Sequence, residues 1–300
     1  MLPIKEKYIN PFTDFGFKKL FGTEMNKDLL MDFLNELIPA HGKIVEINYL
    51  NPELLGRSEA DRRVVFDIHC KTDKDDYFIV EMQRGYQKYF KDRSVYYASF
   101  PIQSQGVKGE WNFELKAVYT VGVLDFEFNK EEPNYFHTEV KLMDTVKKTV
   151  FYDKLTFIYL EMTKFNKTLD QLVSHFDKWL YVLKYLPSLQ ELPARLQERI
   201  FKKAFEIAEI SNMTDLERIE YEDSKKRFND YKNTLDTAKE QGKEEGLIEG
   251  EAKGLVEGIA KGKAEEKIAI AKKLLSKGID IDDISDATGL TTSEINLIKL

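Results

Sequence analysis

Two short apolar segments that lie close together in the sequence constrain the fold of this chain most strongly. Residues 64–70 (VVFDIHC) and 77–83 (YFIVEMQ) each have the length and the β-branched and aromatic content of a buried strand. The charged turn KTDKDD joins them, so together they predict a β-hairpin. If this hairpin is symmetric about Lys74, Asp67 lies opposite Glu81, with the two Cβ atoms about 5 Å apart.

The alternation of side chains along a strand places polar groups on one face of this hairpin. Asp67 shares a face with Val65 and His69, and Glu81 shares one with Ile79 and Gln83. Apolar residues anchor the opposite face and fix the register; they are Val64, Phe66, Ile68, Cys70, Phe78, Val80 and Met82. An ordinary amphipathic hairpin with a wet polar face is the simpler interpretation.

Both acidic residues, however, interrupt apolar runs, where an ionised carboxylate is costly to bury. Two carboxylates that lie close together repel each other unless a cation or a shared proton relieves the repulsion. The oxygen donors at this point favour a hard divalent cation, Mg²⁺ or Mn²⁺. Such an ion can activate water and stabilise charge on a phosphate, so the hairpin is a candidate for phosphoester chemistry.

The flanking sequence predicts helices before and after this hairpin and more strands beyond it. Residues 13–38 read as two short helices, and Asn26 is the expected cap of the second. A strand is expected at about 43–50, a helix through 86–105, and a largely helical region from 169 to about 233. Further strands are predicted at 117–126, 137–143 and 154–162. With 42% hydrophobic residues, the chain can bury a sizeable core.

Glycine recurs at every fourth position in the segment before the C-terminal region. The glycines are Gly242, Gly246, Gly250, Gly254, Gly258 and Gly262. A four-residue repeat stays roughly on one helical face, yet each glycine costs a helix about 1 kcal/mol relative to alanine. Either the glycines pack against a partner helix, which would make the segment an arm for homo-oligomer formation, or the segment is a solvated tether.

Residues 266–300 have the end signals of a small helical hairpin. Asp280 and Thr291 are the expected N-caps, and Thr291 with Glu294 fits a capping box. Gly278 and Gly289 suit helix ends. The stretch ISDATGLTTSEINLI also resembles a helix-turn-helix, so the segment is either a simple hairpin or a DNA-binding module.

Composition excludes several other classes of protein. Cys70 is the only cysteine, so no intramolecular disulfide forms, and the four histidines lack the spacing of zinc ligands; they are His41, His69, His137 and His175. The N-terminus lacks an apolar leader, and no run of about 18 apolar residues is present. We therefore expect a cytoplasmic protein without membrane contact.

A net charge of −7 argues against nonspecific DNA binding by the chain as a whole, so local clusters matter more. Basic residues flank the predicted hairpin on both sides, and they could neutralise DNA phosphates. They are Arg57, Arg62 and Arg63 before it, and Arg84, Lys88, Lys91 and Arg93 after it. The alternative for the second group is a solvated helix face. Tyr96 and Tyr97 could contact a DNA backbone, although one of them is expected in the core.

The order of acidic residues resembles a known signature, the Asp…Glu-x-Lys pattern of the PD-(D/E)xK nucleases. Here Asp67 is followed after a loop by Glu81-Met82-Gln83, with Gln83 at the lysine position. The variant is similar to the transposase-like PD-(D/E)xK nucleases, also called recombination-promoting nucleases. The stretches NPFTDFGFKKLFG, GRSEADRRVVFDIHC, IVEMQRG and KDRSVYYASFPIQSQ and the glycine-repeat tail add to the likeness. The resemblance covers nearly the whole chain and is densest over residues 10–125.

The resemblance implies an α/β fold of the restriction-endonuclease type, with a mixed central sheet flanked by helices and a helical C-terminal region. We divide the chain into a nuclease-like core (1–165), a helical subdomain (166–240), the glycine-repeat arm or linker (241–265) and the terminal hairpin (266–300).

The resemblance also implies roles for individual residues. Asp67 and Glu81 would bind the catalytic Mg²⁺ or Mn²⁺, and Gln83 would position the attacking water or the scissile phosphate. Asp14 and Lys18 are accessory candidates, with a helix N-cap as the alternative for Asp14.

The function implied is that of a Mg²⁺-dependent DNA endonuclease, a hydrolase that would promote DNA recombination or the movement of mobile elements. Weak sequence specificity is expected, because no base-reading element is evident. Glutamine cannot supply positive charge as lysine does. A catalytically inactive DNA-binding or assembly module on the same scaffold is therefore the alternative, and an adaptor acting through the glycine-repeat helix is a third.

Overall fold

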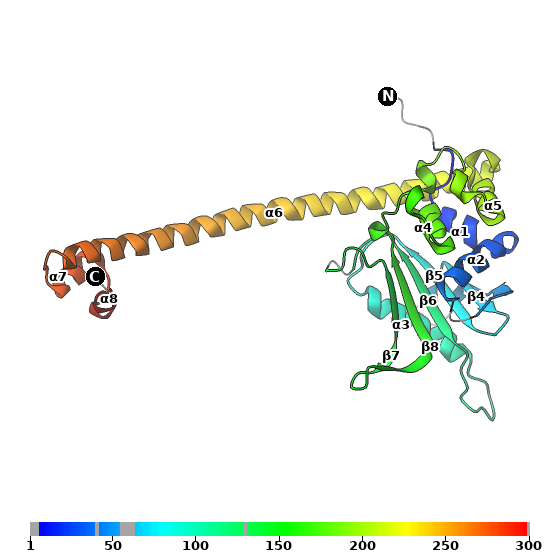
Figure 1. The fold of residues 1–300 in the computed structure, drawn as a ribbon, viewed down its shortest axis with the longest axis horizontal. Helices are drawn as coiled ribbons and strands as arrows, with labels where there is room; N and C mark the ends of the chain where they lie inside the picture. Colours follow the sequence, from blue (N-terminus) through cyan, green and yellow to red (C-terminus); the bar gives the residue numbers. More distant parts are fainter. Residues whose placement is uncertain (1–5, 40–41, 55–63, 129–130, 299–300) are drawn as a thin grey trace. The chain divides into compact units, whose positions relative to one another are not determined.

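The computed structural model describes residues 6–39, 42–54, 64–128 and 131–298. The chain divides into two compact units, Met1–Asn229 and Asp230–Leu300 (Figure 1). All of the strands belong to the first unit, and the described part of the second unit is helical.

A mixed six-stranded sheet forms the centre of the first unit, in the order β1-β4-β5-β6-β8-β7. β5 runs parallel to β6, and β6 parallel to β8, whereas the other neighbours are antiparallel. The strands are β1 (Ile47–Tyr49), β4 (Ile68–Thr72), β5 (Tyr77–Gln83), β6 (Val118–Leu124), β7 (His137–Asp144) and β8 (Thr149–Glu161). The predicted fold class, a mixed central sheet flanked by helices, is confirmed.

The strand predicted at 64–70 is interrupted in the structure. Its start forms β3 (Val64–Val65), which pairs with β2 (Glu53–Leu54) in a separate two-stranded sheet, and β4 begins only at Ile68. The bend between them turns Phe66 to the other side of the sheet. Phe66 packs in a small cluster with Ile79, so the prediction that it shares a face with Ile68 and Cys70 was wrong. The strand predicted at 154–162 also differs, because it begins at Thr149.

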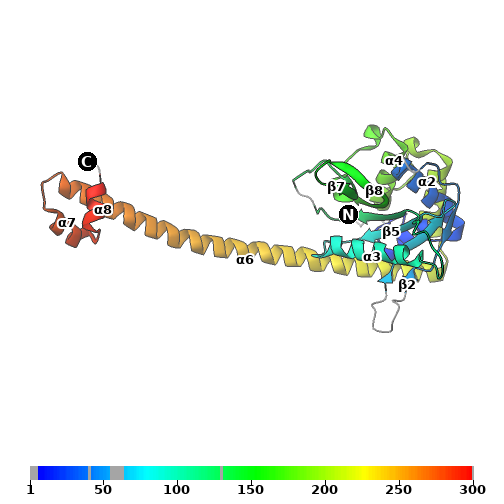
Figure 2. The same ribbon diagram turned by 90° about the horizontal axis from the view of Figure 1, so that it is seen from below.

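Helices cover both faces of the sheet, and Figure 2 shows α3 (Phe90–Ser104) on one side of β5, with α2 (Lys27–Leu37) and α4 (His175–Tyr185) on the other. α1 (Asp14–Phe21) and α5 (Arg199–Ala208) pack in the same core as α2 and α4. α3 packs instead on the face that carries Ile79 and Val118. The site lies where this helix meets the ends of β4 and β5.

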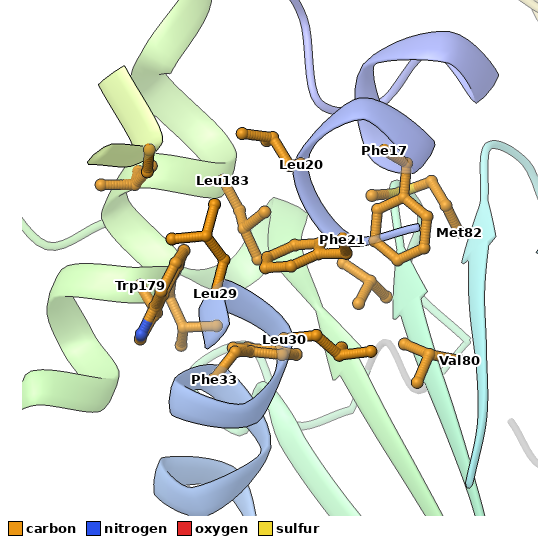
Figure 3. Close-up of a cluster of buried hydrophobic side chains, with 14 of the residues drawn as sticks. Phe17, Leu20, Phe21, Leu29, Leu30, Phe33, Val80, Met82, Trp179 and Leu183 are labelled. Carbon is orange, nitrogen blue, oxygen red and sulfur yellow. The ribbon is translucent and has the colours of Figure 1, made fainter. Parts of the chain in front are cut away.

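The larger core is built around aromatic side chains, as Figure 3 shows. The ring of Phe21 lies 5.6 Å from those of Phe33 and Trp179, and Val80 and Met82 supply the sheet side of the cluster. The indole Nε1 of Trp179 donates to Asp32 Oδ1 at 2.6 Å, which satisfies the polar atom of a buried ring. This cluster holds α1 and α2 against β5.

The beginning of α6 (Asp215–Leu275) is fixed to α1 and to the segment before it. Lys19 forms an ion pair with Glu217. Ser224 Oγ accepts from the backbone N–H of Phe15 at 3.1 Å, and the Tyr221 hydroxyl accepts from that of Asn10 at 3.0 Å. The first turns of α6 are therefore part of the first unit.

The second unit contains the rest of α6, then α7 (Ile281–Thr288) and α8 (Thr292–Leu297). Ala271, Ile284 and Ile295 form its small buried core, so three helical segments meet there. The predicted caps are confirmed: Asp280 caps α7, and Thr291 with Glu294 forms the capping box of α8. Gly278 and Gly289 adopt positive φ at the helix ends, as expected.

The glycine repeat lies inside α6 rather than in a loop. A Cβ atom built at any of the six repeat glycines meets nothing within 4 Å among the residues that the structure describes. Apolar side chains nearby are exposed, among them Leu255 and Val256. The described residues thus show no close packing at these glycines, and the self-association of this arm stays a prediction. Within the described ranges, no helix is long and apolar enough to cross a membrane.

Phe21→Ala should destabilise the first unit by about 3–5 kcal/mol, because it removes a fully buried ring from between α1, α2 and α4. Chemical denaturation followed by circular dichroism measures the change. Phe151→Ala is the matched control, since Phe151 is 82% exposed and its loss should stay within about 0.5 kcal/mol. Equal losses from the two variants would contradict the observed core.

The glycine repeat offers a test between arm and tether. Gly254→Leu with Gly258→Leu should lower the oligomeric mass in solution if the glycines lie at a helix contact, because the larger side chains hold the helices apart. If the segment is a tether, the oligomeric mass should stay the same. Its helix should become more stable, by about 1 kcal/mol for each glycine replaced with a good helix former. Light scattering and circular dichroism on the full chain provide both measurements.

Candidate active site

The side chains of Asp67 and Glu81 lie next to each other. β4 and β5 pair Ile68 with Val80 and His69 with Ile79, and this register continues to residues 67 and 81. The backbone N–H of Asp67 donates to Glu81 Oε1 at 3.2 Å, and the backbone N–H of Met82 donates to Asp67 Oδ2 at 2.7 Å. The structure thus brings together the two carboxylates that the hairpin symmetry predicted to be neighbours.

The hydrogen bond from Met82 to Asp67 takes the place of the next backbone-bonded pair of the β4–β5 ladder. In an antiparallel ladder, directly bonded pairs alternate with non-bonded ones. Thr72 and Asp76 form a bonded pair, with N to O at 2.9 Å, so counting by twos makes Phe66 and Met82 the last bonded pair. Instead, the carboxylate of Asp67 accepts the hydrogen bond from the backbone N–H of Met82. A side chain thereby replaces a backbone partner and holds Asp67 at the bend.

Burial strongly affects the protonation of this pair. Burial, and after it the neighbouring charge of Asp67, raises the pKa of Glu81 to about 8. The pKa of Asp67 is also raised, chiefly by burial, against the opposing effect of the Met82 N–H. Near neutral pH and without a cation, the pair therefore retains a proton.

Gln83, at the end of β5, faces α3. Its Oε1 accepts a hydrogen bond from Arg93 Nη2, and Arg93 Nη1 donates to Gln87 Oε1 at 2.7 Å. Sequence reasoning assigned Arg93 to the DNA-binding rim and did not connect it with Gln83. The spacing of Phe90, Arg93 and Tyr97, three and then four residues apart, could have indicated that Arg93 lies on the sheet-facing side of the helix.

Asp14 and Lys18 approach the carboxylate pair from α1. Their side chains form an ion pair at 2.9 Å. Both charges have smaller effects on the pKa of Asp67 than burial has: the charge of Asp14 raises this pKa, and that of Lys18 lowers it. Asp14 is not the helix cap: Thr13 is, and its Oγ1 accepts from the N–H of Gly16 at 3.0 Å.

The turn before α1 is unusually tight. A Cβ atom on Gly16 would lie 2.1 Å from the carbonyl oxygen of Asn10, so only glycine fits there. This constraint explains the glycine in NPFTDFGFKKLFG and fixes where Asp14 begins the helix. The predicted N-cap at Asn26 differs in detail, because its Nδ2 donates to the carbonyl of Lys19 and its side chain does not cap α2.

The basic residues proposed for DNA differ in their placement. Arg84 and Arg93 are partly buried, and their charges reach Asp67 and Glu81 respectively. Lys88 and Lys91 are exposed on the surface, which also fits a solvated helix face. Arg57, Arg62 and Arg63 lie outside the described residues. Of the two tyrosines considered, Tyr96 is 46% exposed, whereas Tyr97 lies partly buried beside the carboxylates.

The donor set fits a divalent cation held by two protein ligands. No group of three or more His, Cys, Asp or Glu side chains suited to a metal occurs in the part of the chain that the structure describes. Mg²⁺, however, commonly binds through one or two carboxylates and completes its shell with water and substrate phosphate. Two adjacent carboxylates with raised pKa values supply such a pair, and a cation would relieve their repulsion.

The raised pKa of Glu81 predicts how stability changes with pH. The carboxyl group binds its proton more tightly in the folded state, so its stabilising contribution is full below about pH 4.5 and is lost as the pH rises through about 8. In the presence of a chelator, the melting temperature of Glu81→Gln should therefore be higher than that of wild type at pH 8, but not at pH 4.5. Glu206→Gln, an exposed control, should show no such difference. If the difference in melting temperature between wild type and Glu81→Gln is the same at pH 4.5 and at pH 8, the raised pKa of Glu81 is contradicted.

Comparison with known proteins identifies two domain families in the chain. Residues 11–238 match the PD-(D/E)XK nuclease family transposase, and residues 264–300 match the Rpn/YhgA-like nuclease family, C-terminal HTH domain. Comparisons with curated proteins and with solved structures gave no significant match. The first match covers well over half of the chain and includes every residue of the carboxylate site. The chain therefore belongs to the PD-(D/E)XK nuclease family transposases and carries at its end the HTH domain of the Rpn/YhgA-like nucleases.

Proposed function

We propose that this protein is a DNA endonuclease that depends on Mg²⁺ or Mn²⁺ and uses Asp67 and Glu81 as the metal ligands. Membership of the family implies a nuclease, and nucleases of this kind typically use a divalent metal ion. The observation that carries the assignment to this site is the close placement of the two carboxylates: Glu81 accepts from the backbone N–H of Asp67, and Asp67 accepts from that of Met82. Two adjacent, half-buried acids have a chemical role if a cation lies between them and the substrate.

The reaction is hydrolysis of a phosphodiester bond. The oxygen of a water molecule attacks phosphorus, the bond to the leaving oxygen breaks, and the proton from water passes by way of solvent to the leaving oxygen. A bound divalent ion supplies Lewis acidity, which lowers the pKa of water and neutralises phosphate charge. Asp67 and Glu81 hold the ion only when both are ionised, so the pair must first release the proton that burial favours.

DNA contact is proposed for two parts of the chain. Near the carboxylates, Arg84 and Arg93 supply positive charge beside the site, and Lys88 and Lys91 extend it over the surface. The HTH match at residues 264–300 suggests a second contact, in which a helix enters the major groove. Binding should weaken as salt rises, because phosphate contacts release counterions. Strand cleavage of this kind would promote recombination or the movement of mobile elements.

A catalytically inactive DNA-binding or assembly module is the alternative, and one observation favours it. Gln83 stands where the signature has lysine, and its Oε1 is engaged by Arg93. Such a protein would bind DNA without cleaving it, and the loss of Asp67 would leave its DNA binding unchanged.

Asp67→Ala should abolish Mg²⁺-dependent nicking of a supercoiled plasmid, with a loss of at least about 100-fold, because it removes a ligand charge that the reaction requires. Gel electrophoresis of the plasmid over time measures the rate. Asp230→Asn is the matched control, since Asp230 is exposed on α6 far along the chain from the site, and it should cleave at the wild-type rate.

A second measurement separates an inactive protein from a misfolded one. Mn²⁺ should raise the melting temperature of wild type and Asp230→Asn but not that of Asp67→Ala, since a ligand that binds only the folded state stabilises it. Equal nicking by wild type and Asp67→Ala would remove the nuclease assignment from this site. DNA binding without any cleavage by wild type would instead support the inactive module.

A further inference from the structure

The proposed reaction lacks a positive charge at the position where the signature places one. An amide at residue 83 can donate and accept hydrogen bonds but carries no charge to offset the negative charge that grows on a phosphate under attack. The structure places a cation against this amide. The guanidinium of Arg93, on α3, donates from Nη2 to Gln83 Oε1.

We propose that Arg93 is a catalytic residue that contacts the scissile phosphate in place of the missing lysine, and that Gln83 positions it. This inference rests on the proposed function and assigns a transition-state role to a residue otherwise counted with the DNA-binding rim. It also changes the role of Gln83, from contacting water or phosphate to orienting the guanidinium.

Contacts on several sides hold the guanidinium in place. Two of its N–H groups are engaged, Nη2 with Gln83 and Nη1 with Gln87, the latter at 2.7 Å. Its Cζ lies 5.4 Å from the ring centroid of Tyr97 and 5.9 Å from that of Phe90. A guanidinium carries five N–H donors, so two hydrogen bonds leave others for a phosphate. Because its position is already fixed, little conformational entropy is lost when substrate arrives.

The location of Arg93 also connects it with the metal ligands. A narrow pocket between α3 and the sheet is lined by Glu81, Arg93, Tyr97 and Gly122, among others. Gly122 pairs with Glu81 across β5 and β6, and a Cβ atom there would lie 3.1 Å from the ring of Tyr159. The charge of Arg93 reaches Glu81 strongly enough to oppose part of the effect of burial on its pKa.

Other cations near the site have partners that draw them elsewhere. Lys18 forms an ion pair with Asp14 at 2.9 Å. Arg84 lies with its Cζ 5.9 Å from the ring of Phe228, on α6. Lys88 and Lys91 are exposed. Arg93 is thus the cation that lines the pocket with Glu81 and also contacts Gln83.

Arginine constrains the chemistry that this site performs. The guanidinium keeps its proton, so Arg93 cannot serve as a general base. It acts by charge and by paired N–H donors that match the oxygens of a phosphate, and this stabilises the five-coordinate phosphorus more than the starting diester. The proton of the attacking water must therefore leave through solvent or another group.

The test compares Arg93→Met, Arg93→Lys and the double variant Gln83→Lys with Arg93→Met in the full chain. Arg93→Met should lower the nicking rate with Mg²⁺ by about 10²–10³-fold, as the loss of one preorganised donor does elsewhere. The double variant should recover much of this loss, because it restores the signature lysine. DNA affinity, measured by fluorescence anisotropy with Ca²⁺ in place of Mg²⁺, should change no more than in Lys202→Met, an exposed control on α5.

Several results would overturn the proposal. An Arg93→Met rate equal to that of Lys202→Met would do so, as would a loss of affinity that accounts for the whole loss of rate, since the latter indicates a rim contact only. An active Arg93→Met that gains nothing from lysine at residue 83 would also count against it. If Arg93→Met fails to fold by circular dichroism, two further variants decide: Arg93→Lys, which keeps the charge, must retain more activity than Arg93→Gln, which removes it. None of these results removes the nuclease assignment, which falls only if wild type and Asp67→Ala behave alike.

Discussion

The bond from the Met82 backbone N–H to the carboxylate of Asp67 is the interaction on which the rest of the site depends. It ends the pairing of β4 with β5 at a side chain instead of at another backbone group. The strand consequently bends at residues 66–67, Phe66 turns toward α3, and Asp67 stays against Glu81. A regular ladder through residue 66 would have placed Phe66 on the opposite face and left α3 without the aromatic contact that seats it near Glu81.

This arrangement concentrates negative charge in a half-buried site, and three cations partly balance it. Lys18 comes from α1, Arg84 follows β5, and Arg93 lies on α3. Each opposes the rise in the pKa of at least one of the two carboxylates, yet together they do not overcome burial, because both pKa values remain raised. The site is therefore incompletely neutralised by its own residues. That property suits a centre that takes up a cation and an anionic substrate together, since each of them compensates the charge of the other.

The carboxylate pair could be predicted from sequence because it depends on local rules. Strand periodicity, the apolar runs and the length of one turn are enough to place residues 67 and 81 opposite each other. The bend at Phe66 could not be predicted, because it follows from a hydrogen bond between a side chain and a backbone group of another strand. The same holds for the contact between Gln83 and Arg93, which requires that α3 cross the end of β5. Thr13 rather than Asp14 as the cap of α1 depends on the tight turn at Gly16, a feature of backbone geometry.

The family match reaches into α6 because the first turns of this helix pack against α1 and the segment before it. The sheet ends with β8 at Glu161, yet the matched region continues to residue 238. Glu217, Tyr221 and Ser224 bind α1 and the segment before it, and Phe228 lies against Arg84. α1 carries Asp14 and Lys18, so the first turns of α6 support one wall of the carboxylate site. The matched family domain therefore includes the beginning of α6, and the same helix continues toward the HTH domain.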